Sequence, residues 1–367
     1  MDKELVEQIR RLRDGITKQT GHYEGVAVTK PREPEKPKLA AALKSGDADA
    51  YKFSDVWGIA PSNGLPDIVI TAFDGDDWHE SVRSCIPSDE DTYVPQGLNE
   101  FMFTKAMESN QRVLLTGPAG SGKSTLPKVF AARTCRPFFR FQCNQSTEFE
   151  DLFGNLSVRG GEVVWIDGPV TQAARYGGIV CLDEVSTLRA GAALGLQWLL
   201  ERGGKIHLPS FPSDDPSDKY VTPHDEFRIA LTDNTNLSGD DTGRYVGTNV
   251  QNAALKDRID LFIRVAYMSS DAEFSMVKKH VPSIDDSVLK NMVRFAGEIR
   301  NGFEKGSCES TVSPRVLLRW ARDTVAFGNI GFALRYTLVN GASADDETVI
   351  ASVYKKVFGE TLPGSTV

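Results

Sequence analysis

One short stretch constrains the fold more than any other part of the sequence. Residues 111–125 read QRVLLTGPAGSGKST, so that an apolar run leads into Gly117 and the stretch ends with Gly122, Lys123, Ser124 and a threonine. This is the G-x-x-x-x-G-K-[ST] pattern of a phosphate-binding loop that joins a strand to a helix. The glycines let the backbone turn its N–H groups toward phosphate oxygens, where a Cβ would interfere. A glycine-rich turn without a ligand is the alternative, and the Lys-Ser pair argues against it.

The residue types in this loop predict binding of ATP together with Mg²⁺. We expect Lys123 to reach the β- and γ-phosphates as a point charge and the Ser124 hydroxyl to ligate the metal ion. The following helix directs the positive end of its dipole toward the anion. The predicted nucleotide contacts form one continuous run: Gly117, Pro118, Ala119, Gly120, Ser121, Gly122, Lys123, Ser124 and Thr125.

A second motif, GGIVCLDEV, covers residues 177–185. The apolar run 179–182 is typical of a strand that is buried on both faces of a parallel sheet. Asp183 and Glu184 follow at its carboxyl end, where ligands bind in open α/β sheets. We expect Asp183 to contribute to the nucleotide and Mg²⁺ site, directly or indirectly, and Glu184 to be the catalytic base that orients the attacking water. An acidic strand end that faces solvent is the alternative.

Two weaker candidates for catalysis come later in the chain. Asn234 lies near the end of the strand-like run 227–236 and could hydrogen-bond the attacking water or the γ-phosphate, although asparagine after a strand more often forms a turn. Arg258 lies in the run ALKDRIDLF, residues 254–262, which begins like a helix. An arginine delivered from a neighbouring subunit neutralises transition-state charge in many NTPases. From the residues alone, a salt bridge within the helix or on the surface is the favoured alternative for Arg258.

Arg315 is a further candidate because of its position near the start of a predicted helix. Ser313 is a good N-cap and Pro314 suits the first turn. A cation close to a helix start is disfavoured by the helix dipole. This misfit indicates that Arg315 has an anionic partner.

The first 95 residues predict two segments that precede the nucleotide-binding core. Residues 1–50 contain a predicted helix, 2–14, and a proline- and charge-rich linker, 30–38. Residues 51–95 predict a small strand-rich lead-in. Its acidic cluster, 74–77, predicts a solvated loop rather than a calcium site, because no glutamate stands at the required distance.

Residues 96–268 predict an α/β core and residues 269–367 an all-helical lid. In the core, two apolar stretches around Arg159-Gly160-Gly161-Glu162 predict a hairpin over 156–169. The other predicted core elements are a strand at 137–142 and helices at 98–109, 125–134, 148–153 and 170–176. The predicted lid helices cover 271–281, 285–305, 314–327, 332–339 and 345–358.

Charge and cysteine usage argue against several function classes. The formal net charge of −8 and the pI near 5.3 argue against a general nucleic-acid or membrane binder, although a local basic channel that binds nucleic acid stays open as an alternative. The five cysteines are scattered without zinc-site spacing, which favours reduced, buried thiols in a cytoplasmic protein. No apolar run reaches the roughly 18 residues of a membrane span, and the charged N-terminus does not read as a signal peptide.

The order of these motifs resembles the AAA+ ATPases of the MoxR and dynein-related branch, and most of all the cobaltochelatase ATPase subunits of the CobS type. The resemblance covers roughly residues 53–362. The residues that carry it are SGDDTGRYVGTNVQNAALKDR at 238–258, SPRVLLRWARDTVAFGNIGFALRYT at 313–337, FSDVWGI at 53–59 and YKKVFGETL at 354–362.

The resemblance implies an AAA+ P-loop core with a parallel sheet between helices, followed by a helical lid. It implies a homo-oligomeric ring of six subunits whose active sites lie between neighbours. Asp183 and Glu184 would be the Walker B pair, Asn234 sensor 1, Arg258 the arginine finger and Arg315 sensor 2. The hairpin 156–169 and the insert 205–223 would face the pore or a partner, with Trp165 or Tyr220 touching a substrate or packing locally.

The resemblance implies that the ring remodels a protein partner, either one with a von Willebrand A-type domain or a chelatase-like subunit. A nucleic-acid motor and a scaffold that uses ATP only to assemble are the alternatives. The acidic balance disfavours the motor, and the Asp183-Glu184 pair argues against the scaffold. The sequence departs from the family at Thr235, where MoxR proteins usually have proline. Arg244 in the Thr-Gly-x-Tyr run is a candidate second inter-subunit arginine.

Overall fold

The computed structural model describes residues 50–89, 93–201, 203–239, 248–249 and 253–364. The predicted helix 2–14, the predicted linker 30–38 and Arg244 lie outside these residues. Within the described ranges, no helix combines the length and the apolar character needed to cross a membrane.

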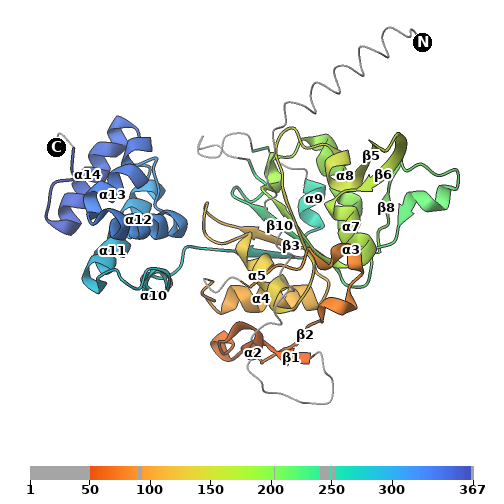
Figure 1. Ribbon diagram of the computed structural model, residues 1–367, viewed down its shortest axis with the longest axis horizontal. Coiled ribbons are helices and arrows are strands. Elements are labelled where there is room, and N and C mark those ends of the chain that lie inside the picture. The colour runs from red at the N-terminus through yellow and green to blue at the C-terminus, as the bar shows by residue number, and fades with distance from the viewer. Residues whose placement is uncertain (1–49, 90–92, 202, 240–247, 250–252, 365–367) are drawn as a thin grey trace, which may run out of the picture. The chain divides into compact units, whose positions relative to one another are not determined.

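A five-stranded parallel sheet forms the centre of the nucleotide-binding region (Figure 1). Its strand order is β11-β3-β10-β7-β4, and every neighbouring pair is parallel. The register sets Thr116 beside Asp233 and Gln142 beside Asp183, so these strands end at one edge of the sheet. The strands are β3 (Val113–Thr116), β4 (Phe138–Gln142), β7 (Gly178–Asp183), β10 (Phe227–Asp233) and β11 (Leu261–Arg264). The predicted parallel sheet is thus confirmed.

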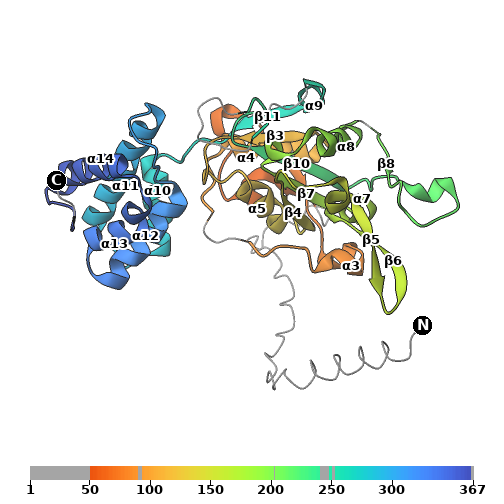
Figure 2. The same cartoon turned by 90° about the horizontal axis from the view of Figure 1, so that it is seen from above.

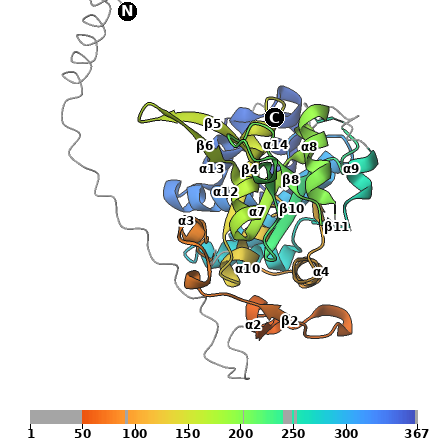
Figure 3. The same ribbon diagram turned by 90° about the vertical axis from the view of Figure 1, so that its right-hand side faces the viewer.

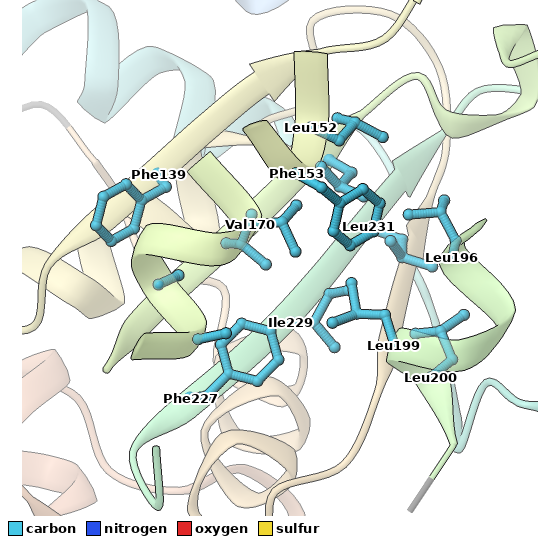
Figure 4. Close-up of a cluster of buried hydrophobic side chains, with 14 of the residues drawn as sticks. Phe139, Leu152, Phe153, Val170, Leu196, Leu199, Leu200, Phe227, Ile229 and Leu231 are labelled. Atoms are coloured by element: carbon cyan, nitrogen blue, oxygen red, sulfur yellow. The ribbon is translucent and has the colours of Figure 1, made fainter. Parts of the chain in front are cut away.

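Helices cover both faces of this sheet. Alternate residues of each strand point to opposite faces, so each face contributes apolar side chains to a different buried cluster. On one face Val113, Leu115 and Ile179 share a buried cluster with α4 (Leu98–Glu108) and α5 (Thr125–Arg133). Leu114, Val180 and Leu182 share the opposite cluster with α6 (Phe149–Phe153), α7 (Pro169–Tyr176) and α8 (Ala190–Leu200). Figure 1 shows α4 and α5 on one side of the sheet and α7 and α8 on the other. In Figure 4, side chains of β10 and of these helices pack against one another in the second cluster.

Two small antiparallel ribbons interrupt the α/β core. The predicted hairpin is confirmed as β5 (Gly154–Arg159) and β6 (Glu162–Asp167), and Figures 2 and 3 show it projecting from the core. It carries exposed apolar side chains at Leu156, Val158 and Val163. The second ribbon pairs β8 (Ile206–His207) with β9 (Tyr220–Val221), with the 3₁₀ turn η4 (Pro216–Lys219) between them.

One sequence prediction, for the lead-in, was wrong, and one strand of the core was not predicted. The lead-in is not strand-rich: β1 (Ala50–Lys52) and β2 (Val69–Thr71) are the two strands that the structure has in the described part of it. Buried anchors such as Trp57, Trp78 and Val82 fix the remainder to the core without strand pairing. Strand β11 was not predicted, because its four residues follow the short helix α9 (Ala253–Asp257) and continue its apolar spacing. The remaining lead-in elements are α2 (Phe53–Trp57), η1 (Ser62–Gly64), η2 (Gly75–Asp77) and α3 (Glu80–Arg83).

The C-terminal region is helical, as predicted. Its buried cluster contains large side chains such as Phe295, Trp320 and Tyr354. Ser313 caps α12 by accepting the N–H of Val316 at 3.3 Å, as the Ser-Pro pair predicted. The helices are α10 (Ser270–His280), α11 (Asp286–Glu304), α12 (Pro314–Phe327), α13 (Ile330–Thr337) and α14 (Ala344–Phe358). The division into a core at 96–268 and a lid at 269–367 stays a prediction.

Candidate active site

The phosphate-loop sequence forms the connection between β3 and α5. Gly117 has a backbone φ of +149°, and a Cβ there would lie 2.1 Å from the carbonyl oxygen of Val265. Gly120 and Gly122 also have positive φ values, which residues with a Cβ rarely adopt. The loop backbone therefore has a curvature that glycines favour, and this geometry fits a phosphate group.

Lys123 is buried within the concave side of this loop. Its Nζ donates hydrogen bonds to the carbonyl oxygens of Gly117 and Pro118, both at 2.8 Å, and to Oδ1 of Asn234 at 2.7 Å. Burial lowers the pKa of Lys123 to about 8, against the opposing effect of nearby carboxylates. The structure thus brings together Lys123 and Asn234, two predicted site residues from different strand ends.

Asp183 lies at the end of β7 and accepts hydrogen bonds from several side chains. The Ser124 hydroxyl lies 2.9 and 3.0 Å from its two carboxylate oxygens, and Thr232 donates to Oδ1. Arg140 on β4 forms an ion pair with Oδ2. Burial alone would raise the pKa of Asp183, but the hydrogen bonds from Thr232, Arg140 and Ser124 and the charge of Arg140 lower it overall. Ser124 and Asp183, both predicted metal residues, are therefore in direct contact.

Glu184 occupies the strained position directly after the strand. Its φ of +58° lies in the left-handed region, and its N–H donates to Oγ1 of Thr232 at 3.1 Å. Its half-buried carboxylate has no hydrogen-bond or ion-pair partner among the residues that the structure describes. The backbone is thus fixed while the carboxylate stays available to a ligand.

The residues fit a Mg²⁺ ion that shares its coordination with a nucleotide. Ser124 and Asp183 offer adjacent oxygen donors, which Mg²⁺ prefers. No cluster of three or more His, Cys, Asp or Glu side chains in the described ranges could hold a metal ion by itself. The other ligands would have to be phosphate oxygens and waters, as is usual for Mg²⁺.

A pocket beside the loop includes residues of the helical region. Arg315, in the first turn of α12, lines it together with Gly120 and Gly122. Arg315 is exposed, and within the described part of the chain no carboxylate forms an ion pair with it. The anionic partner that the sequence indicated is therefore not a described side chain. The other lining residues include Tyr93, Val94, Asn99, Glu100, Met268 and His280.

Arg258 does not lie at this site in its own chain. Its Nη2 pairs with Oε1 of Glu201 at 2.9 Å, and its Nη1 donates to the carbonyl of Ala254 at 2.7 Å. The salt bridge that the sequence left open as an alternative is thus present. Of the two insert aromatics, Trp165 packs against Phe211, and the exposed Tyr220 stacks on a histidine.

Sequence reasoning missed three residues of the site: Arg140, Thr232 and Asp233. Arg140 is the one charged residue in the strand FFRFQ, which was the available signal. Asp233 is fully buried, and its Oδ2 accepts the N–H groups of Thr235 at 3.0 Å and Leu237 at 2.6 Å. These bonds fix the turn that presents Asn234.

A parallel sheet with a buried loop lysine and an Asp-Glu pair at one edge defines a P-loop nucleotide-binding ATPase. Comparison with known proteins refines this class. Residues 112–259 match the AAA domain of the dynein-related subfamily, and residues 273–357 match the CbbQ/NirQ/NorQ C-terminal domain. Residues 112–259 therefore form an AAA+ ATPase core, and the chain is similar to the CobS and NorQ proteins.

Two named relatives and one solved structure are similar to the chain to different extents. The chain is 28% identical over 313 residues to the aerobic cobaltochelatase subunit CobS of a Sinorhizobium species. The aligned region covers 81% of this chain and 92% of CobS. Protein NorQ of Paracoccus denitrificans is 39% identical over 109 residues, covering 30% of this chain and 40% of NorQ. Among solved structures, the RuvB Holliday junction branch migration motor of Thermotoga maritima matches with 14% identity and a TM-score of 0.41, over 74% of this chain and 72% of RuvB.

Proposed function

We propose that this chain hydrolyses ATP with Mg²⁺ as a ring-forming ATPase of the cytoplasm and that it remodels or activates a protein partner. The observation that carries the proposal is the convergence of a buried lysine, a Ser-Asp pair and an unpartnered glutamate at one sheet edge: Lys123, Ser124, Asp183 and Glu184. Phosphate transfer to water requires this combination of positive charge, oxygen ligands and a water-orienting group.

Each side chain then has a task in hydrolysis. The backbone of residues 117–122 and Thr125 cradles the phosphates, and Lys123 binds the β- and γ-phosphate oxygens. Mg²⁺, held from Ser124 and Asp183, would neutralise charge on these oxygens when bound. Glu184 orients the attacking water and accepts its proton. Asn234, fixed by its contact with Lys123, positions the water or the γ-phosphate.

Arg315 is the proposed link between the γ-phosphate and the lid. Its exposed guanidinium at the loop pocket, without a carboxylate partner among the described side chains, supports this role. A cation at a helix start is favourable only when an anion is near. The γ-phosphate would supply that anion, so that lid position depends on the nucleotide.

Binding of phosphate is expected to weaken above about pH 8. Because the pKa of Lys123 is about 8, its amine loses its proton as the pH rises through this value. Phosphate favours the charged amine, so binding above pH 8 takes up a proton, and the affinity falls by up to about tenfold per pH unit. Titration of a fluorescent ADP between pH 7 and 9.5 measures this. An affinity that is constant over that range would contradict the assignment of Lys123 as a phosphate ligand.

Arg258 is proposed to act on the active site of the neighbouring subunit. Arg258→Ala is expected to lower ATP turnover about tenfold or more, whereas Glu201→Ala, which removes its ion-pair partner, leaves turnover unchanged. The variant alone cannot separate a finger from a structural role. Mixing the Arg258→Ala and Glu184→Gln subunits, each with lowered turnover, can separate the two roles. In such mixed assemblies some interfaces combine an intact Arg258 with an intact Glu184, and turnover should exceed the average of the two variants. Recovery of turnover supports action between subunits, and no recovery contradicts it.

The partner is proposed to be a protein with a von Willebrand A-type domain or a chelatase-like subunit. The similarity to a subunit of aerobic cobaltochelatase supports this choice. The exposed apolar side chains of the hairpin, Leu156, Val158 and Val163, offer a contact surface that faces solvent in the single chain.

A trapping experiment tests the proposed function. Glu184→Gln is held in ATP, bound material is recovered, and proteins and nucleic acids are identified. Recovery of a von Willebrand A-type or chelatase-like protein, lost when Val158 and Val163 are both changed to serine, is the expected result. Recovery of salt-sensitive nucleic acid without protein would instead favour a nucleic-acid motor.

A further inference from the structure

Arg140 makes a contact with Asp183 that the proposed roles leave unexplained. Its Nη2 and Nε both lie against Oδ2 of Asp183, the Nε at 3.1 Å. The side chain of Arg140 is 50% exposed, whereas that of Asp183 is 6% exposed. A half-exposed guanidinium therefore contacts a buried carboxylate that is a proposed metal residue.

The hydrogen bonds to Asp183 leave little acceptor capacity for a metal ion. A carboxylate has about four lone-pair sites. Thr232 donates to Oδ1, the Ser124 hydroxyl lies within bonding distance of both oxygens, and Arg140 presents two N–H groups to Oδ2. Mg²⁺, or a water bound to it, can approach this carboxylate only if one of these donors leaves.

Arg140 is the donor whose departure costs least. Thr232 is fully buried on the neighbouring strand β10, and Ser124 is itself a proposed metal ligand. Arg140 is half-exposed, so water can solvate its released guanidinium, and Oε1 of Gln142 already lies 3.5 Å from its Nη2. A guanidinium and Mg²⁺ at the same oxygen would also repel each other.

We propose that Arg140 is a positioning residue that competes with Mg²⁺ for Asp183 and moves away from its Oδ2 when the metal–nucleotide complex binds. The inference rests on the proposed function, because it requires a Mg²⁺-dependent nucleotide site. Arg140 compensates the charge of Asp183 and keeps its carboxylate oriented when the metal is not bound. It thereby raises the Mg²⁺ concentration that the site needs.

The test measures the Mg²⁺ requirement of nucleotide binding, without reference to turnover. Fluorescent ADP is bound to the full chain while Mg²⁺ is titrated, for the wild type, Arg140→Ala, Arg140→Lys and Arg83→Ala. In Arg140→Ala the half-saturating Mg²⁺ concentration is expected to fall about two- to fivefold, as for loss of a partly exposed ion pair. Arg140→Lys keeps the charge but not the two-point contact. Its half-saturating Mg²⁺ concentration should therefore lie between those of Arg140→Ala and the wild type. Arg83, which is 44% exposed and pairs with Asp76, is the matched control and should show no change.

Each contrary result has a separate meaning. A Mg²⁺ requirement in Arg140→Ala that equals or exceeds the wild-type value overturns the inference and leaves the proposed function intact. A lysine variant equal to the wild type, with a lowered value in the alanine variant, assigns the effect to charge at a distance and overturns direct competition. A wild-type chain whose ADP binding does not depend on Mg²⁺ overturns both the proposed function and the inference. Thermal melts establish that each variant is folded, and Arg140→Gln replaces the alanine variant if that one is not.

Discussion

Replacing Glu184 with glutamine is expected to lower ATP turnover by about 10²- to 10⁴-fold while nucleotide binding stays within about twofold of the wild type. The amide has the shape of the carboxylate but cannot accept a proton from water. The carboxylate of Glu184 has no hydrogen-bond or ion-pair partner among the described residues, and the N–H bond to Thr232 comes from its backbone. The substitution therefore removes no contact of the described fold, and the melting temperature should change by less than about 2 °C. Steady-state phosphate release and binding of fluorescent ADP measure the two effects.

A charge-matched control separates this effect from a general loss of negative charge. Glu80→Gln on the exposed face of α3 removes the same charge away from the sheet edge and should retain full turnover. Glu184→Gln with wild-type turnover would remove Glu184 from the mechanism. The Asp183 carboxylate, with its acceptor sites taken by three neighbours, would not be an adequate replacement base.

Motifs that are continuous in sequence could be predicted well. The phosphate loop requires glycines at fixed spacings because its backbone is curved, and the Cβ clash of 2.1 Å at Gly117 gives the physical reason. The apolar run at 179–182 indicated a strand buried on both faces, and β7 is fully buried. The Ser-Pro pair at 313–314 predicted a helix start, and α12 begins there with Ser313 as its cap.

Contacts between strands could not be predicted, because they depend on register. Arg140 meets Asp183 because β4 and β7 pair with Gln142 beside Asp183. Thr232 meets the same carboxylate because β10 lies on the other side of β7. Nothing in the local sequence of β4 or β10 specifies which strand becomes its neighbour, so these two members of the site emerge only from the folded sheet.

Short strands and contacts between subunits could not be predicted from the sequence either. β11 has four residues, which is too few for a strand period to stand out from the preceding helix. Within the single chain Arg258 forms an ion pair with Glu201. The proposed role of Arg258 between subunits would instead require contact with a second chain. Side-chain chemistry alone does not distinguish these two uses of one arginine.

Replacing Lys123 with alanine is expected to weaken nucleotide binding by about 100-fold or more and to abolish measurable turnover. A charge-assisted contact to phosphate contributes about 1.5–3 kcal/mol, and in the proposed mechanism Lys123 would contact two phosphate groups. The effect on folding should be small for a specific reason. Alanine loses the bonds to the Gly117 and Pro118 carbonyls, but it also removes the cost of burying an ammonium group, which the lowered pKa of Lys123 reflects.

Two measurements distinguish loss of the phosphate contact from loss of the loop structure. Lys105→Ala, an exposed lysine on α4, is the control and should bind fluorescent ADP like the wild type. Lys123→Met keeps the length and apolar stem of the side chain without its charge. The loop should therefore stay folded, while fluorescent ADP should bind more weakly than to the wild type. If Lys123→Met bound nucleotide normally, binding would need neither the charge of the amine nor its hydrogen bonds to Gly117, Pro118 and Asn234, and Lys123 would not be a phosphate ligand.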